Sequence, residues 1–393
     1  MHVAYLSSTL TVHDARFLRK LVERGYRTSL ITYYQGPLPT WVTEIDGLTT
    51  VHHAPRRLLR YQSALFGFRG PSLRRLLRQL NPDVLHSGYV WKDGFAGSLS
   101  GFHPHLVMPW GSDILLDPTR RSVLRWIDRY VLRQADMITC DCEVVADRII
   151  AMSGVPRDRI AVFPWGVDQA VFHPRVVPAS VRHDRGWVDR TVLIMNRNFE
   201  PTYNVAGFLV ALGQVLQQRP DVRVLLGGSG SEEQRLRQIV RDFGLEDVVH
   251  FLGQVPPARM AEYLAASDLY VSNSFSDGSS LSLLEAMSCG LPVVVSDAPA
   301  NLEWVTPRGN GFVAPRGDDV QLAATLLEAL RDPERLRRMG ARNQEIARAR
   351  ADWERNFRKL EMIYETLTSL HRPGNAGPND DGERDRQPRS RPR

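Results

Sequence analysis

The chain alternates strand-like and helix-like segments twice, and this repetition constrains its fold more than any other feature. Residues 2–7 and 28–33 have the apolar character of strands, and an amphipathic helix is predicted over 13–24 between them. After a polar stretch with several prolines over 164–190, the alternation starts again with a strand over 191–195. Strands that alternate with helices predict a parallel sheet covered on both faces. We therefore expect an α/β fold with two doubly wound domains that face a central cleft.

The other predicted elements continue this order. Strands are predicted over 84–86, 106–109, 137–140, 160–163, 222–226 and 248–252, and helices over 205–217, 232–243 and 352–370. The expected divisions are a first domain over 1–170, a linker over 171–190, a second domain over 191–345, a terminal helix within 346–371 and a tail over 372–393. The tail is rich in proline, glycine and arginine, so it is expected to be disordered.

Length and composition set the broad class of protein. A chain of 393 residues with 43% hydrophobic residues is typical of two soluble domains. No stretch approaches the roughly 20 apolar residues that span a bilayer, and the N-terminus has no basic start followed by an apolar core. We therefore expect a cytoplasmic protein. Cys140, Cys142 and Cys289 neither pair evenly nor have metal-binding spacing, so no disulfide and no zinc site are expected.

The net charge of +6 comes almost entirely from arginine, and one segment concentrates it. Residues 56–80 contain seven arginines and no acidic residue, interleaved with leucine and aromatic side chains. This composition predicts either a segment that lies on an anionic membrane surface or a solvated helix face whose leucines pack on the core. Nucleic acid is not expected as a partner, because the basic residues lie beside aliphatic residues and not beside a stacking platform of aromatic ones.

A short stretch in the second half combines a carboxylate, a turn of small residues and a helix start. The turn over 278–280 precedes the apolar run 281–287, so its N–H groups are expected to be free at a helix N-terminus. Free N–H groups and the helix dipole favour a phosphate there. Glu285 is expected on the ligand side, where it can accept both hydroxyls of a ribose, and Asp277 precedes it by eight positions. The stretch predicts a site for a nucleotide diphosphate sugar.

The sequence DGSSLSLLEAMSCGLPVVVSDAPANLE over 277–303 resembles the signature of the family 4 (group 1) retaining glycosyltransferases. That family has the GT-B fold, in which two Rossmann-like domains face a cleft and a C-terminal helix crosses back to the first domain. Its signature has two Glu eight positions apart before an AMxxGxPVV run, and here Asp277 takes the first position and Glu285 the second. An isolated turn of this kind is also explained by Asp277 as a helix cap. The flanking motifs favour the family, and the resemblance covers about residues 2–365.

The resemblance implies a role for each part of the site. The second Glu of the signature holds the ribose, the first contacts the donor sugar, and the backbone between them cradles the diphosphate. A cation after the first strand of the second domain neutralises the leaving diphosphate, because charge that develops there is the main cost of breaking the bond. The catalytic residues are then expected to be Arg197, Asp277 and Asp113, and the donor-binding residues to be Glu285, Gly278, Ser279, Ser280, Leu281, Gly227, Gly228, Trp110 and Gly111.

This chain departs from the family pattern at three places. The paired glycines after the first strand are replaced by serine and threonine over 7–9, and the His-Gly-x-Asp motif is replaced by WGSD over 110–113. A tryptophan can stack on a sugar face but cannot exchange a proton. A second cation, a lysine in the family, falls on Thr202 or Tyr203, so Arg197 would act with the helix dipole alone or with another arginine such as Arg235.

Two histidines are the alternative polar groups in the first domain. His86 ends the predicted strand over 84–86, and His13 begins the predicted helix over 13–24. His86 is at least as well explained as a structural histidine, and His13 is better explained as a surface cap. The glycine turn LLGGSGS over 225–231 is expected to be a strand-to-helix turn near the nucleotide, because its glycine spacing does not fit a dinucleotide fingerprint.

The resemblance implies transfer of a hexosyl group from a nucleotide diphosphate sugar to an acceptor hydroxyl, with retention at the anomeric carbon. No carboxylate is placed as a covalent nucleophile, unlike in retaining hydrolases, so the leaving phosphate is expected to take the acceptor's proton. No metal or other cofactor is expected. The acceptor is expected to be a saccharide or a lipid-linked compound of cell-envelope, exopolysaccharide or glycolipid biosynthesis.

Two other functions stay open on the sequence. A sugar-nucleotide epimerase or phosphorylase has the same architecture, but those families do not combine this carboxylate spacing with the AMxxGxPVV run. A non-catalytic nucleotide-sugar-binding protein or partner subunit would explain the missing histidine, lysine and paired glycines. Formation of product distinguishes the transferase from the binding protein.

Overall fold

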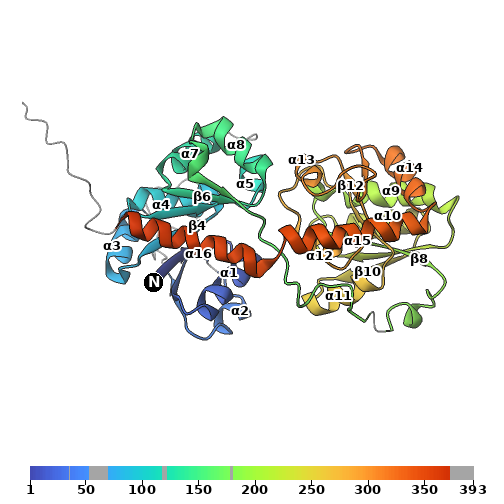
Figure 1. Ribbon diagram of the computed structural model, residues 1–393, viewed down its shortest axis with the longest axis horizontal. Coiled ribbons are helices and arrows are strands. Elements are labelled where there is room, and N and C mark those ends of the chain that lie inside the picture. The colour runs from blue at the N-terminus through green and yellow to red at the C-terminus, as the bar shows by residue number, and fades with distance from the viewer. Residues whose placement is uncertain (35, 53–69, 117–121, 178–179, 372–393) are drawn as a thin grey trace, which may run out of the picture.

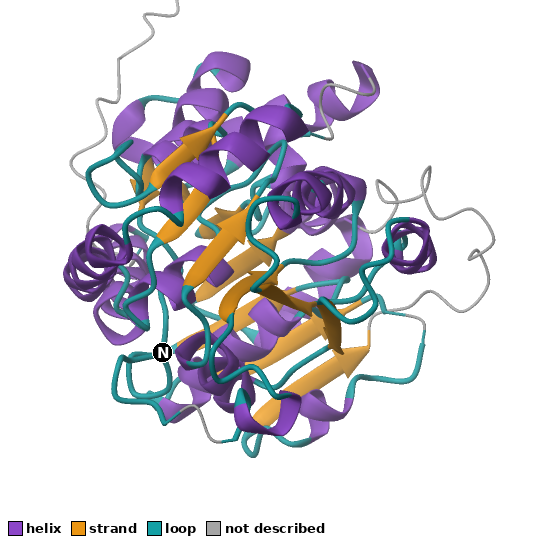
Figure 2. Cartoon of the chain, turned by 90° about the vertical axis from the view of Figure 1, so that its right-hand side faces the viewer, coloured by secondary structure: helices purple, strands orange, loops and turns teal. Residues whose placement is uncertain are grey.

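Two parallel β-sheets, each lying between layers of helices, form two domains that are joined side by side (Figure 1). The computed structural model describes residues 1–34, 36–52, 70–116, 122–177 and 180–371. The first sheet has seven strands in the order β3-β2-β1-β4-β5-β6-β7, and the second has six in the order β10-β9-β8-β11-β12-β13. Seen from the side of the second domain, the strands lie between helices on both faces (Figure 2). The predicted α/β fold with two Rossmann-like domains is confirmed.

The strands are short, and most of them are buried. Those of the first sheet are β1 (His2–Leu6), β2 (Arg27–Thr32), β3 (Leu48–His52), β4 (Val84–Gly88), β5 (His105–Met108), β6 (Met137–Cys140) and β7 (Ile160–Val162). Those of the second are β8 (Thr191–Asn196), β9 (Val222–Gly227), β10 (Val249–Gly253), β11 (Leu269–Ser272), β12 (Val293–Ser296) and β13 (Phe312–Ala314). Every residue of β1 is buried, which is the pattern of a parallel strand with both faces covered.

The helices cover both sheets. In the first domain they are α1 (Val12–Glu23), α2 (Thr40–Thr43), α3 (Gly70–Leu80), η2 (Tyr89–Gly94), α4 (Phe95–Ser100), α5 (Ser112–Leu115), α7 (Ser122–Gln134), α8 (Glu143–Ser153) and η3 (Arg157–Arg159), and η4 (His183–Arg185) follows. In the second they are η5 (Pro201–Tyr203), α9 (Val205–Leu216), α10 (Glu233–Asp242), α11 (Pro257–Ala265), α12 (Leu281–Ser288), α13 (Pro299–Leu302), α14 (Asp319–Ala329) and α15 (Pro333–Arg350). The last helix is α16 (Trp353–Leu370). None of the described helices is long and apolar enough to cross a membrane.

Helix α1 shows how the sequence fixes the order of the elements. Thr11 and Asp14 form a capping box, in which each side chain bonds the backbone N–H of the other residue. The apolar side chains at Phe17, Leu18 and Leu21 are buried in one face. Gly25 then takes a positive φ of 79°, which ends the helix and turns the chain into β2.

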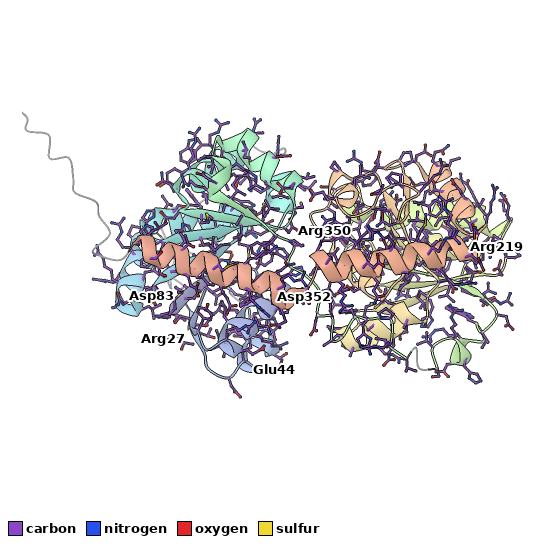
Figure 3. The ribbon with its side chains drawn as sticks, in the orientation of Figure 1. Arg27, Glu44, Asp83, Arg219, Arg350 and Asp352 are labelled. Atoms are coloured by element: carbon purple, nitrogen blue, oxygen red, sulfur yellow. The ribbon has the colours of Figure 1, made fainter. Side chains whose placement is uncertain are left out.

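The chain crosses between the domains twice, and the two crossings bond to each other. The N–H of Val167 donates to the carbonyl of Ala351 (2.7 Å), and the N–H of Trp353 donates to the carbonyl of Val167 (3.1 Å). Gly166 has a φ of 85°, and a Cβ there would lie 3.0 Å from the backbone nitrogen of Trp353. The turn at Asp352 lies where the two domains meet (Figure 3). A glycine is needed at position 166 so that its backbone can approach that of Trp353.

Helix α16 begins at this crossing and returns to the first domain, while α15 lies on the second (Figure 1). Six of its side chains join one buried cluster with residues of β1, α1 and β5: Trp353, Phe357, Leu360, Ile363, Tyr364 and Leu367. The helix predicted over 352–370 corresponds to α16, whereas residues 346–350 of the expected terminal segment belong to α15, which ends at Arg350. The tail over 372–393 lies outside the described residues.

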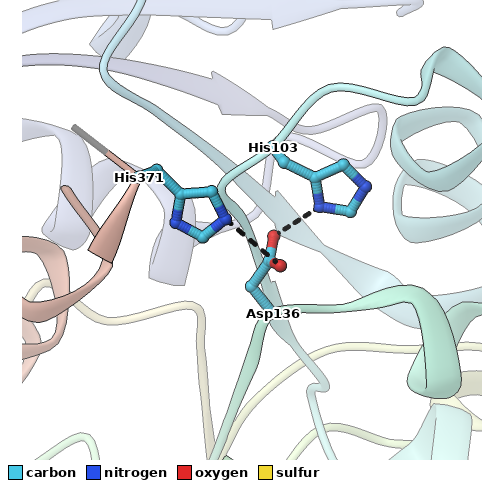
Figure 4. A group of neighbouring side chains, drawn as sticks. All are labelled: His103, Asp136 and His371. Carbon is cyan, nitrogen blue, oxygen red and sulfur yellow. Dashed lines mark hydrogen bonds and ion pairs between the residues drawn. The ribbon is translucent and has the colours of Figure 1, made fainter. Parts of the chain in front are cut away.

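A group of polar side chains fastens the end of α16 to the first domain (Figure 4). Asp136 accepts the N–H of His105 (2.6 Å), bonds Nδ1 of His103 (2.7 Å), and lies 3.6 Å from Nε2 of His371. In the described part of the chain this is the one group whose donor atoms are close enough to hold a metal ion. Asp136 and His103 precede strands β6 and β5, so the group lies at the amino edge of the sheet, away from the interdomain boundary.

We expect Phe357→Ala to lower the free energy of unfolding by about 3–5 kcal/mol, because this ring is 1% exposed and packs on Phe17 and Trp353. Met362→Ala is the control, since this side chain on the same helix is 56% exposed and should change the value by about 0.5 kcal/mol or less. Urea unfolding followed by tryptophan fluorescence measures both. Small effects of equal size would show that α16 is not part of the first-domain core.

Candidate active site

The turn before helix α12 lies at the carboxyl edge of the second sheet, next to the first domain. The chain leaves β11 at Ser272 and enters α12 at Leu281. Ser280 is the N-cap, and its hydroxyl accepts the N–H of Leu283 (3.4 Å). Leu281 packs against the apolar core of the first domain. The predicted helix start therefore lies at the boundary between the domains.

Arg197 holds this turn from the neighbouring strand. β8 and β11 are adjacent in the sheet, so residues that follow them meet at the same edge. The Arg197 guanidinium forms an ion pair with Asp277, donates to the hydroxyl of Ser280 and donates to that of Ser282 (3.0 Å). It also lies over the ring of Tyr203, 4.1 Å from the centroid. Tyr203, one of the two residues expected at the position of the family's second cation, is thus an aromatic ring that contacts the guanidinium of Arg197.

The ion pair is almost out of contact with solvent. The side chains of Arg197 and Asp277 are 7% and 13% exposed. Burial lowers the pKa of Arg197, but attraction to Asp277, Tyr270 and Tyr203 outweighs it and raises that pKa above its ordinary value. Burial raises the pKa of Asp277, and the guanidinium offsets part of this effect. Asp277, predicted to contact the donor sugar, and Arg197, predicted to neutralise the diphosphate, therefore neutralise each other in this structure.

The glycine turn after β9 positions the backbone of Arg197. The N–H of Arg197 donates to the carbonyl of Gly227 (3.1 Å). Gly228 has a φ of 130°, and a Cβ there would lie 2.1 Å from the carbonyl oxygen of Arg197. Any larger residue would displace the arginine. These two glycines thus lie beside the predicted site, where they shape it through Arg197.

Glu285 lies in the second turn of α12 and is half-buried. Among the described residues its carboxylate has no hydrogen-bond partner, and burial raises its pKa to about 7, against the attraction of Arg16 and Arg197. Arg16 comes from α1 of the first domain and donates to the carbonyl of Gly166 (2.9 Å). It was missed from the sequence, although it lies one helical turn after His13. A cation from each domain therefore faces Glu285.

The WGSD motif lies across the boundary from the turn. Gly111 has a φ of 91°, and a Cβ there would lie 3.7 Å from the Cα of Gly278. The Trp110 ring stacks on His13, with 5.4 Å between centroids, and its indole N–H is buried without an acceptor in the described part of the chain. Burial and Arg16 lower the pKa of His13 to about 4. His13 is therefore neutral at pH 7 and is not the surface cap that was expected.

Asp113 has a different place from the one expected of a catalytic residue. It is fully buried, and its carboxylate accepts the N–H groups of Trp110 (2.9 Å) and Val90 (3.0 Å). These bonds hold the loop that carries Trp110. The geometry favours a positioning role for Asp113.

A different carboxylate of the first domain, that of Asp141, contacts the turn before α12. Asp141 follows β6, and its Oδ2 accepts the N–H of Ser279 (2.8 Å), while the Ser279 hydroxyl donates to the Asp141 carbonyl (2.7 Å). Nearby, the Glu303 carboxylate accepts the N–H groups of Val144 (2.9 Å) and Glu143 (3.2 Å). Asp141 was not predicted as a site residue, because its signal in the sequence is a carboxylate directly after a predicted strand.

Two other candidates lie apart from the turn. Arg235 is 65% exposed and pairs with Glu232 (2.5 Å), so it does not replace the missing second cation in this structure. His86 is fully buried, and its Nδ1 bonds the hydroxyl of Tyr364 (2.6 Å). The structural explanation of His86 therefore fits its surroundings.

Solved structures with the same arrangement define the class of protein. The fold is similar to that of sucrose-phosphate synthase from Thermosynechococcus elongatus (TM-score 0.79, 19% identity, covering 94% of this chain and 100% of that one). It is equally similar to that of Anabaena HepE, solved with UDP and glucose (TM-score 0.79, 19% identity, covering 93% and 100%). The chain therefore has the GT-B fold.

Sequence comparison assigns the family. The profile described as "Glycosyl transferases group 1" matches residues 182–346, and that described as "Glycosyl transferase 4-like domain" matches residues 10–166. The chain belongs to the group 1, family 4 glycosyltransferases and uses a nucleotide sugar as donor.

Curated relatives resemble the chain over most of its length. One is the GDP-mannose-dependent monoacylated alpha-(1-6)-phosphatidylinositol monomannoside mannosyltransferase of Corynebacterium glutamicum, 28% identical over 72% of this chain and 74% of that protein. Another is the N-acetyl-alpha-D-glucosaminyl L-malate synthase of Bacillus anthracis, 26% identical over 88% and 91%.

The raised pKa of Glu285 predicts a pH-dependent stability. The folded chain keeps this proton up to about pH 7, whereas an unfolded glutamate releases it near 4.3. The unfolded state therefore binds fewer protons between these values, so this group makes the free energy of unfolding fall as pH rises. Glu285→Gln should become more stable relative to the unmodified protein between about pH 5 and 7.5.

Urea unfolding at several pH values measures this difference. Glu246→Gln, at an exposed position of the same domain, is the matched control and should give a nearly constant difference. A constant difference for Glu285→Gln as well would contradict the raised pKa.

Proposed function

We propose that this glycosyltransferase moves a hexosyl group from a nucleotide diphosphate sugar to an acceptor hydroxyl with retention at the anomeric carbon. The observation that carries the proposal is the cluster of Arg197, Asp277 and Ser280 at the N-terminus of α12. A buried cation and a helix N-terminus together favour a diphosphate. Glu285, one turn into the same helix, is the carboxylate for the ribose hydroxyls, and Asp277 is the one for the sugar.

In this proposal the arriving diphosphate competes with Asp277 for Arg197. The guanidinium has several N–H donors, so it can bond a phosphate oxygen and keep part of its contact with Asp277. Its charge then stabilises the diphosphate as the glycosidic bond breaks. Glu285 accepts the ribose hydroxyls in its ionised form, which Arg16 and Arg197 favour by attraction.

In the proposal, retention does not proceed through a covalent glycosyl-enzyme, because the turn has no suitable nucleophile. Asp277 is held in the ion pair, and Glu285 is assigned to the ribose. The leaving phosphate oxygen would then take the proton of the acceptor hydroxyl on the face that it leaves. No metal or other cofactor has a role in this scheme.

We propose that the acceptor, a saccharide or a lipid-linked compound, binds on the first domain. One relative, which is named for a phosphatidylinositol monomannoside, supports a lipid-linked acceptor. The indole N–H of Trp110, which is buried and has no acceptor among the described residues, is a first-domain donor beside the turn. The pathway proposed is cell-envelope, exopolysaccharide or glycolipid biosynthesis.

A panel of UDP-, GDP- and ADP-sugars tests the function. Thermal shift reports binding, release of the nucleotide reports turnover with a membrane extract as acceptor, and proton NMR of the product reports the anomeric configuration. We expect one donor to give all three signals with retention, and Glu285→Ala to lose them. Binding without turnover would favour a nucleotide-sugar-binding protein, and an inverted product would contradict the mechanism.

Replacing Arg197 by glutamine should lower kcat by about 10²–10³-fold, the cost of removing one donor that stabilises charge in the transition state. Arg235→Gln is the matched control, since this exposed arginine of the same domain pairs only with Glu232 among the described residues. Steady-state kinetics with saturating donor measures both variants, and thermal unfolding checks that each is folded. Unchanged kcat in folded Arg197→Gln would remove Arg197 from the mechanism.

We also propose that α3 contacts an anionic membrane surface. Of the basic segment over 56–80, residues 70–80 are described and 56–69 lie outside the described residues. Leu73 and Leu77 are buried in the core, while Arg75 and Arg78 are exposed. Leu73 and Leu77 are therefore not available to insert into a bilayer, and contact would be electrostatic.

Flotation with anionic liposomes tests this contact. At low salt we expect association, and Arg75→Glu with Arg78→Glu should weaken it at least tenfold, at about 1 kcal/mol per basic residue at the surface. The exposed pair Arg337→Glu and Arg338→Glu on α15 is the control. Equal binding by both double variants would contradict a role for α3.

A further inference from the structure

Asp141 divides its carboxylate between two tasks at the interdomain boundary. The side chain comes from the first domain and is 5% exposed. Its Oδ2 accepts the N–H of Ser279 at 2.8 Å and so supports the turn before α12. Its Oδ1 is buried and accepts no hydrogen bond from a nitrogen or oxygen donor of the described residues. A buried carboxylate oxygen without such a donor has capacity for a ligand.

The backbone opposite is shaped for this approach. A Cβ at Gly278 would lie 2.4 Å from Oδ2 of Asp141, so a side chain at that position would exclude the carboxylate. Gly278 lies between Asp277, assigned to the donor sugar, and Ser279, in the diphosphate cradle. Asp141 therefore reaches the part of the turn that lies next to the sugar.

The carboxylate of Asp141 adds a negative charge beside the ion pair of Arg197 and Asp277. Burial raises the pKa of Asp141 to about 6, the Ser279 N–H and the Cys142 thiol lower it, and the neighbouring Asp277 raises it. At pH 7.5 the carboxylate is ionised and can only accept hydrogen bonds. Together with Asp277, it favours a ligand that donates hydroxyl groups and repels one that carries another carboxylate.

We propose that Asp141 forms the first-domain side of the donor-sugar subsite, where its Oδ1 accepts a sugar hydroxyl and selects uncharged hexoses over uronic acids. This inference rests on the proposed function. It gives the first domain a part in choosing the donor as well as the acceptor. A hydroxyl reaches Oδ1 when the two domains part at the crossings near Gly166 and Asp352, and closure then buries the contact.

Asp141→Asn in the full chain tests the proposal, because its amide oxygen can still accept the Ser279 N–H while its amide nitrogen replaces Oδ1. The probes are a neutral hexose and the corresponding uronic acid on the same nucleotide, with kcat/KM measured for each. We expect kcat/KM for the neutral donor to fall about tenfold or more and the preference over the uronic donor to fall at least as much. The Kd of the free nucleoside diphosphate should change less than twofold.

Glu303→Gln is the matched control, because Glu303 also bridges the domains but bonds the start of α8 instead of the turn. Its donor preference should equal that of the unmodified protein. An unchanged preference in Asp141→Asn, or an equal loss in Glu303→Gln, would overturn the role of Asp141 and leave the proposed function intact. Failure of the unmodified protein to transfer any sugar would overturn both.

Asp141→Glu serves as the second variant if Asp141→Asn does not fold. It keeps the charge and moves it by one methylene, so kcat/KM for the neutral donor should fall while the uronic donor stays rejected. Uptake of the uronic donor by this variant would contradict selection by charge.

Discussion

The buried ion pair between Arg197 and Asp277 is the interaction on which the site depends. It joins the end of β8 to the turn before α12 and holds a cation beside a helix N-terminus. Removing two charges from water is expensive, and such a pair is weak evidence for stability by itself. Here the hydroxyls of Ser280 and Ser282 and the ring of Tyr203 also contact the guanidinium. We interpret Arg197 as a preformed anion site, in which a diphosphate can take over contacts that the carboxylate of Asp277 makes in this structure.

Close backbone approaches bring the first domain to this site. Gly111 and Gly278 face each other across the boundary, and Gly166 lets the two chain crossings bond each other. A Cβ at Gly278 would lie 2.4 Å from Oδ2 of Asp141 and one at Gly166 would lie 3.0 Å from the nitrogen of Trp353, so a side chain at either position would force the backbones apart. Because of these contacts, Arg16 lies close enough to Glu285 to attract its carboxylate. For the same reason, Asp141 can accept the N–H of Ser279. Both domains therefore contribute charged side chains to the donor site, although the signature sequence lies in the second domain alone.

The fold could be predicted from the sequence because strands buried on both faces and amphipathic helices leave strong periodic patterns. β11 and β12 were not predicted as strands, since the short apolar run of β11 lies just before the signature and that of β12 lies within it. The donor turn was predictable because its residues are contiguous. Arg16 and Asp141 could not be found in the same way, because each belongs to the site only after the domains meet. Asp113 was predicted as catalytic from its motif position, which does not reveal that both carboxylate oxygens bond backbone N–H groups.

The central claim is that the nucleotide sugar binds at the turn before α12. Hydrogen–deuterium exchange tests it most directly, measured with and without a nucleotide sugar that the protein uses as a donor. Peptides that cover 277–288 and 196–203 should gain protection when the donor binds, together with the peptide that contains Asp141. The group of His103, Asp136 and His371, at the opposite edge of the first sheet, should not change. Protection confined to the first domain, with none over 277–288, would contradict the account.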